Sequence, residues 1–134
     1  MSTNRWATNL AVLDEMLRCV SSGDMGGELA YLADDVTYEA PYYAGFGVKR
    51  GRDAIAAMLS AVEERFSSIH YEVVASYPTA DPDLVIAEVR GDHAVVGSQR
   101  RYQNHYLMFL RFRDGKVTEW REFSNPDVYR AAVD

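Results

Sequence analysis

The chain has one cysteine, four prolines and no long hydrophobic segment in its 134 residues. A lone Cys19 cannot form an intrachain disulfide, which argues against a disulfide-stabilised secreted domain and fits a reducing compartment. No apolar run approaches the roughly 20 residues that a membrane-spanning helix needs. The first ten residues, MSTNRWATNL, lack the apolar core of an export signal. We therefore expect a cytoplasmic protein that does not enter a membrane.

Positive charge is also scarce. The chain has 14 Lys and Arg against 20 Asp and Glu, and its formal net charge is −6. Nucleic-acid-binding proteins normally present a basic surface, and here the basic residues form only the short Arg100-Arg101 pair, which we expect to be solvated. Nucleic acid is therefore not an expected partner.

The motifs that would indicate a metal, a nucleotide or a covalent nucleophile are missing. The three histidines, His70, His93 and His105, do not form a short-spaced metal-binding pair. The glycines of residues 45–51 do not keep the spacing of a dinucleotide-binding loop, and no serine lies in a G-x-S-x-G context. We expect no metal and no cofactor.

Length and composition predict one domain over residues 1–134, because 48% hydrophobic residues can bury a core without covalent cross-links. Apolar residues at three- and four-residue intervals predict the first helix, and prolines and glycines separate the later elements. The order of elements predicts an α+β fold. The expected helices are 4–20, 24–33, 53–66 and 127–133, and the expected strands are 36–40, 69–77, 84–90 and two more on either side of residues 114–115.

Residues 101–125 read as a long β-hairpin, because Asp114-Gly115 favours a two-residue type I′ turn. If Arg113 pairs with Lys116, the register follows. The predicted pairs are Leu107 with Glu122, Phe109 with Trp120 and His105 with Ser124, all on one face. Neither face of the hairpin is cleanly polar, so both are expected to be covered, one by helices and the other by a second subunit. This pattern predicts a homodimer.

Glu122 is the main candidate for chemistry, because a carboxylate among aromatic residues has a shifted pKa and can act as an acid or base. Trp120 lies beside it in the sequence, and His105, on the same predicted face, could polarise a substrate. The alternative is structural: Glu122 in a salt bridge with an arginine, His105 as an ordinary sheet residue and Trp120 as core.

Three segments resemble a SnoaL-like domain of the nuclear-transport-factor-2-like, or ketosteroid-isomerase-like, superfamily. They are LADDVTYEAPY at 32–42, RGRDAI at 50–55 and RYQNHYLMFLRFRDGKVTEWREF at 101–123. The resemblance implies a cone of strongly curved, mixed or antiparallel sheet around about three helices, with a pocket at the open end. Such proteins are usually dimers, need no cofactor as a rule and carry out many unrelated activities.

The last hairpin is most similar to phenazine-biosynthesis A/B proteins. That resemblance implies a pocket glutamate at Glu122 and a pocket tyrosine at Tyr102. The position of a catalytic histidine in those proteins holds Met58, which cannot carry a proton, so the same reaction is not expected. Tyr102 shares a face with Glu122 only if a β-bulge lies between them, because one extra residue reverses the alternation of side chains.

Together these observations predict a pocket for a small, largely apolar organic molecule. Glu122 is the expected general acid/base, with Tyr102 or His105 orienting the substrate, and the expected chemistry is proton transfer in an isomerisation, cyclisation, dehydration or condensation. The alternative is a binding module without catalysis. The residues expected to shape the pocket are Trp120, Met58 and Tyr42.

Overall fold

The computed structural model describes residues 4–134, which form four helices and seven strands. This mixture confirms the predicted α+β class. The helices are α1 (Arg5–Ser21), α2 (Met25–Leu29), α3 (Arg52–Arg65) and α4 (Pro126–Val133). The strands are β1 (Leu32–Glu39), β2 (Val48–Arg50), β3 (Phe66–Ser68), β4 (Tyr71–Tyr77), β5 (Leu84–Val95), β6 (Arg101–Arg113) and β7 (Lys116–Phe123).

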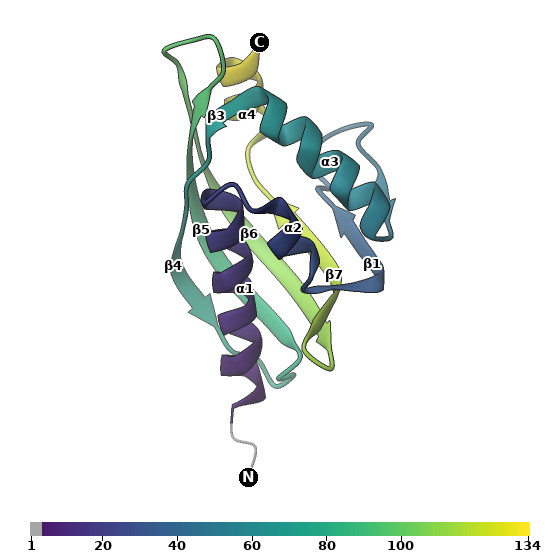
Figure 1. Ribbon diagram of the computed structural model, residues 1–134. Helices are drawn as coiled ribbons and strands as arrows, with labels where there is room; N and C mark the ends of the chain where they lie inside the picture. Colours follow the sequence, from purple (N-terminus) through teal and green to yellow (C-terminus); the bar gives the residue numbers. More distant parts are fainter. Residues whose placement is uncertain (1–3) are drawn as a thin grey trace.

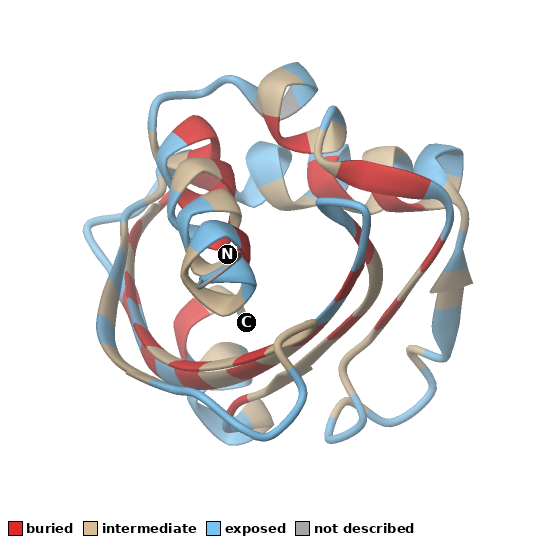
Figure 2. Ribbon diagram, turned by 90° about the horizontal axis from the view of Figure 1, so that it is seen from below, coloured by how far each residue is buried: buried red, intermediate tan, exposed pale blue. Residues whose placement is uncertain are grey.

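All seven strands belong to one mixed sheet in the order β2-β1-β7-β6-β5-β3, and β4 also pairs with β5. The β1–β7 pair is parallel and the other pairs are antiparallel. The sheet curls around α1, as Figure 2 shows from below, and α3 lies across its other half (Figure 1). This arrangement confirms the predicted cone.

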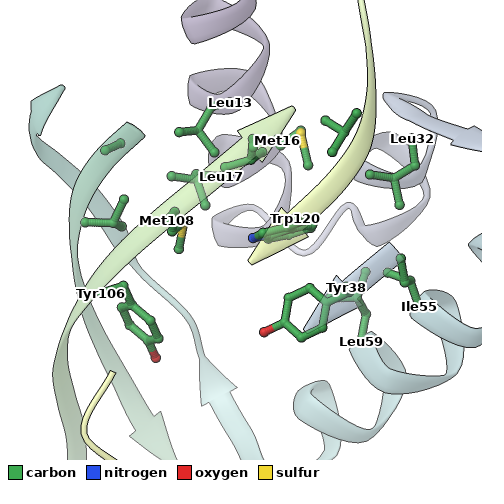
Figure 3. Packing of buried hydrophobic residues seen from close by; sticks show 14 of the residues in the cluster. Leu13, Met16, Leu17, Leu32, Tyr38, Ile55, Leu59, Tyr106, Met108 and Trp120 are labelled. Carbon is green, nitrogen blue, oxygen red and sulfur yellow. The ribbon is translucent and has the colours of Figure 1, made fainter. Parts of the chain in front are cut away.

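The core fills the space between α1 and the concave face of the sheet. Leu13 and Met16 of α1 are fully buried, as are Met108 and Leu110 of β6. Figure 3 shows the α1 side chains directed toward Met108 and Trp120. Each such side chain contributes about 1.5–3 kcal/mol of hydrophobic stabilisation. The packed core therefore fixes one half of the cone and leaves the space under α3 to the cavity described below.

The hairpin has the predicted turn but not the predicted register. Asp114 and Gly115 have φ of 52° and 80°, as a type I′ turn requires, and Arg113 pairs with Lys116. The next pairs are Phe112 with Val117 and Arg111 with Glu119, so Thr118 is an extra residue that forms a bulge. Glu122 therefore lies opposite Met108, and the three predicted pairs with Leu107, Phe109 and His105 were wrong.

The bulge reverses the alternation of the rest of β7 relative to β6. The residues of β6 at even positions from 102 to 112 are buried on the concave face. Trp120 lies opposite Leu110 on this face, followed two residues later by Glu122. Tyr102 could share a face with Glu122 only if a bulge lay between them. That bulge is present.

Several boundaries differ from the prediction. Residues 30–33 were expected to be helical, but α2 ends at Leu29 and β1 begins at Leu32. The short strands β2 and β3 were missed, since three residues give no readable alternation. The strand predicted at 84–90 continues to Val95 because it pairs with β6 and β3 beyond Arg90. Within residues 4–134, none of the helices is long and apolar enough to cross a membrane.

Candidate functional site

A cavity of about 740 Å³ lies between α3 and the concave face of the sheet. This volume is within the range of about 300–1,000 Å³ that is typical of small-molecule sites. Nine aromatic side chains make its wall rigid and mostly apolar. They are Tyr38, Tyr43, Phe46, Phe66, Tyr71, Tyr102, Tyr106, Trp120 and Tyr129. Trp120 and Tyr38 lie side by side with Tyr106 across from them (Figure 3).

Glu122 lies in the wall of this cavity, on β7. The Tyr38 hydroxyl on the neighbouring strand β1 donates a hydrogen bond of 2.8 Å to its Oε2 atom. Burial raises the pKa of Glu122 to about 7, and the effect is partly offset by Tyr38 and the indole of Trp120, which lower it. A carboxyl with this pKa can exchange a proton near neutral pH in either direction.

No arginine neutralises Glu122 in the described part of the chain. None of the ion pairs among residues 4–134 includes it. The neighbouring Arg121 points to the opposite face, where its guanidinium lies 5.0 Å from the Phe109 ring and 5.6 Å from the Phe123 ring. The predicted alternative of a structural salt bridge is therefore not found.

Tyr38 remains a neutral phenol. Burial, followed by the nearby charge of Glu122, holds its pKa well above the ordinary value of 10.0. Because Tyr38 keeps its proton, it can only stabilise the carboxylate by donation. The Trp120 ring packs edge-on against Tyr38 at 5.2 Å and is 3% exposed, so the donor has a fixed orientation.

Tyr102 also lines the cavity, as predicted. Its hydroxyl accepts hydrogen bonds from Asn104 Nδ2 at 2.8 Å and from the Tyr106 hydroxyl at 2.9 Å, which leaves its own proton to donate. Burial raises the pKa of Tyr102 above that of a free phenol. The Phe66 ring is stacked on its ring at 5.6 Å. Tyr102 is therefore a neutral phenol whose position is fixed by these contacts, on the same face as Glu122.

Two predicted site residues lie outside the cavity. His105 is on the convex face, and the bulge in β7 places Glu122 on the other one. The Nε2 atom of His105 is 3.1 Å from Glu88 Oε1, and its side chain is 53% exposed. Tyr42 is 61% exposed and packs on Phe123. The loop instead directs its neighbour Tyr43 into the wall, with the hydroxyl 2.9 Å from Ser124 Oγ. The predicted positions of His105 and Tyr42 were wrong.

The other two predicted pocket residues, Met58 of α3 and Trp120, do line the cavity. Glu28 and His93 are among the polar lining residues that were not predicted. His93 could have been found, because it follows Val89 and Gly91 in the buried phase of β5. Glu28 had no such signal, since α2 is only five residues long.

His93 is a neutral imidazole whose orientation is fixed. It is 1% exposed, and burial lowers its pKa to about 4. Its Nδ1 accepts a hydrogen bond of 3.3 Å from the backbone N–H of His70, so Nε2 carries the proton. Within residues 4–134, the Nε2–H group of His93 has no hydrogen-bond partner. His93 is therefore a residue of the cavity wall with a buried, unpaired N–H donor.

Comparison with known proteins gives the family. The model of the SnoaL-like domain matches residues 13–120. The chain belongs to the SnoaL-like family. One fold can host many unrelated activities, so membership establishes the fold more firmly than the reaction.

One relative of this SnoaL-like protein and two solved structures illustrate the similarity in sequence and in fold. An uncharacterised PhzA/B-like protein of Pseudomonas aeruginosa is 32% identical over 117 residues, which cover 86% of this chain and 82% of the relative. The structure of a putative isomerase from Bacillus subtilis matches with a TM-score of 0.87 and 23% identity over 97% of this chain and 95% of the other. A putative polyketide cyclase from Xanthomonas campestris has a TM-score of 0.81 and 20% identity, with 98% and 100% coverage.

The charged groups in the cavity wall of this SnoaL-like protein are two cations and two carboxyls. In residues 4–134, no group of three His, Cys, Asp or Glu side chains is arranged to hold a metal ion. The two cations in the cavity wall, Lys49 and Arg65, are engaged by aromatic groups: Lys49 Nζ lies 4.5 Å from the centre of the Phe46 ring, and Arg65 Nη1 donates to the Tyr129 hydroxyl at 2.9 Å. The ionisable groups without a counter-charge are the carboxyls.

Proposed function

We propose that this SnoaL-like protein binds a small, largely apolar organic molecule in the cavity and moves a proton on it, with Glu122 as the general acid/base. One observation carries the proposal: an acid with a pKa of about 7 lies in an aromatic cavity with a phenol, not an arginine, as its partner. The isomerase and cyclase named among the structural relatives fit this chemistry.

The reaction class follows from what the cavity wall offers. Glu122 takes a proton from a carbon atom activated by a neighbouring carbonyl, and the apolar wall keeps out water that would compete for it. Tyr38 donates a hydrogen bond to Glu122 and stabilises the carboxylate before the substrate binds. Tyr102 supplies a further donor from the same face. Isomerisation, cyclisation, dehydration and condensation all contain such a step and need no cofactor.

A binding module without catalysis is the second candidate. Met58 favours it, because this side chain lines the cavity at the position where the phenazine-type resemblance implies a proton-carrying histidine. The two candidates share the ligand class and differ only in turnover.

The experiment is deuterium exchange at the α-carbon of 2-tetralone, an apolar bicyclic ketone, followed by NMR in heavy-water buffer. The wild-type protein should accelerate exchange over buffer, and Glu122→Gln should reduce the acceleration by at least about a hundredfold, the usual size of a lost general base. Glu119→Gln, on the same strand but ion-paired with Arg111 at 3.6 Å, is the matched control and should exchange normally. Binding of 2-tetralone without acceleration would favour the binding module, and full activity of Glu122→Gln would remove Glu122 from the mechanism.

We also propose that the convex face of the hairpin forms a homodimer interface in the cytoplasm. Leu107, Phe109 and Phe123 are only half-buried on that face, and paired copies would cover them. Sedimentation at micromolar concentration tests the assembly, and a monomer under these conditions contradicts it.

A further inference from the structure

The buried polar atoms without a partner gather at the cavity. Within residues 4–134, five side chains have such atoms, and three of the five residues line the cavity: Glu28, His93 and Trp120. An unpaired buried polar group costs about 1–3 kcal/mol, so a native fold rarely keeps one unless a partner arrives. Their concentration at one cavity indicates that a ligand supplies the missing partners.

Within the described residues, Glu28 has two unpaired polar atoms, whereas His93 and Trp120 have one each. Its side chain is 0% exposed, and neither of its carboxyl oxygens has a hydrogen-bond partner in the described chain. The Asp24 carboxylate caps α2 by accepting from the Gly27 N–H at 2.8 Å. A Cβ atom at Gly27 would lie 3.0 Å from Cys19 Sγ, so only glycine lets α2 pack this closely against α1. The cap at Asp24 and the close packing at Gly27 therefore fix the position of α2, which carries Glu28.

No cation acts on Glu28 within the described residues. The groups coupled to it are Cys19 from α1, Tyr71 from β4 and Glu122 from β7. Burial, followed by the nearby charge of Glu122, raises the pKa of Glu28 to about 8. Because the charge on Glu122 raises the pKa of Glu28, the pair favours the state in which one carboxyl is ionised and the other keeps its proton.

We propose that Glu28 is a second ligand-contacting acid of the cavity, which donates its proton to an oxygen atom of the ligand. The unpaired His93 Nε2–H favours an oxygen acceptor too, because it is also a donor. A molecule with an apolar body and one carbonyl or enol oxygen would match the mostly aromatic wall and these two donors. We therefore take an apolar ketone or its enol as the ligand class.

The inference rests on the proposed function, because it takes Glu122 as the base. The Glu122 carboxylate accepts the α-proton, and the electron pair of the broken C–H bond forms the C=C bond of the enol. The π pair of the C=O bond moves to oxygen, which takes the proton of Glu28 and leaves a carboxylate there. The return of both protons, with carbon receiving its proton from Glu122 and the enol oxygen giving its own to Glu28, completes the tautomerisation and consumes nothing else.

The test compares 2-naphthol, which resembles the enol of 2-tetralone, with naphthalene, which has the same ring system without the oxygen. Fluorescence titration gives both affinities for each variant. The wild type should prefer 2-naphthol. Glu28→Leu should reduce that preference about tenfold, the effect of one lost hydrogen bond of about 1.4 kcal/mol. Glu28→Gln keeps an N–H donor, so it should keep most of the preference yet slow the exchange of 2-tetralone by at least about tenfold.

Each outcome is decisive. An unchanged preference in Glu28→Leu, or an equal loss of affinity for both ligands, overturns the proposal, since the residue would then act only through packing. Normal 2-tetralone exchange by Glu28→Gln also overturns it, which keeps the test valid if Glu28→Leu does not fold. If the preference falls in Glu28→Leu while the wild type does not accelerate exchange, Glu28 contacts the ligand and the proposed proton transfer is what fails. The exposed Glu63→Gln is the control for both assays.

Discussion

Replacing Glu28 by glutamine should stabilise the protein, and more so as the pH rises. In the unfolded chain a glutamate ionises near pH 4.5, whereas burial keeps Glu28 protonated up to about pH 8 in the folded chain. Between these values the folded state holds one more proton than the unfolded state. The stability that this group supports is therefore complete below about pH 4.5 and is lost as the pH rises through about 8.

The magnitude follows from the same two values. Each pH unit between them lowers the free energy of unfolding by about 1.4 kcal/mol. Between about pH 5.5 and about pH 7.5 the wild type should therefore lose about 2–3 kcal/mol relative to Glu28→Gln, because glutamine does not ionise. Urea unfolding of both proteins at the two pH values measures this difference directly, and groups that do not interact with Glu28 cancel when the two proteins are compared at one pH.

Glu63→Gln is the matched control, since Glu63 is exposed on α3. The same measurements on Glu63→Gln show what a glutamate-to-glutamine change does at an exposed site. A pH-independent difference between Glu28→Gln and the wild type would refute the reasoning, because Glu28 would then ionise in the folded protein as it does in the unfolded chain.

Three further predictions test other parts of the structure. Tyr38→Phe removes the hydrogen bond to Glu122 and should raise the pKa of that carboxyl further, so the pH midpoint of 2-tetralone exchange should move upward; an unmoved midpoint counts against the role of Tyr38. Deletion of Thr118 removes the bulge and should destabilise the fold by several kcal/mol in urea unfolding, because Trp120 would turn outward; unchanged stability would contradict the register. Phe109→Glu should convert the proposed dimer to a monomer in sedimentation, and a persistent dimer would place the interface elsewhere.

The sequence predicted the fold well because its signals are local. The apolar stripe of residues 4–20 and the Asp114-Gly115 turn each depend on neighbouring residues, and both are found in the structure. The bulge at Thr118 is different. Threonine there looks like any strand residue, and the extra residue shows only when β7 is aligned with β6 by packing of the core.

The site was predicted less completely for the same reason. Glu122 and Tyr102 were found through motifs, whereas the face of His105 depended on a register that one extra residue reversed. Glu28 was missed because its burial results from α2 packing against α1, which no periodicity in five residues reveals. Contacts between distant segments, such as Tyr38 with Glu122, are produced by the tertiary fold.

The most direct test of the central claim is a crystal structure of the protein with 2-naphthol bound. The account predicts that the naphthol ring lies in the cavity beside Trp120, with Glu122 directed at the ligand and its partner still Tyr38 rather than an arginine. A ligand bound elsewhere, or a Glu122 carboxylate in a salt bridge or a subunit interface, would contradict the account.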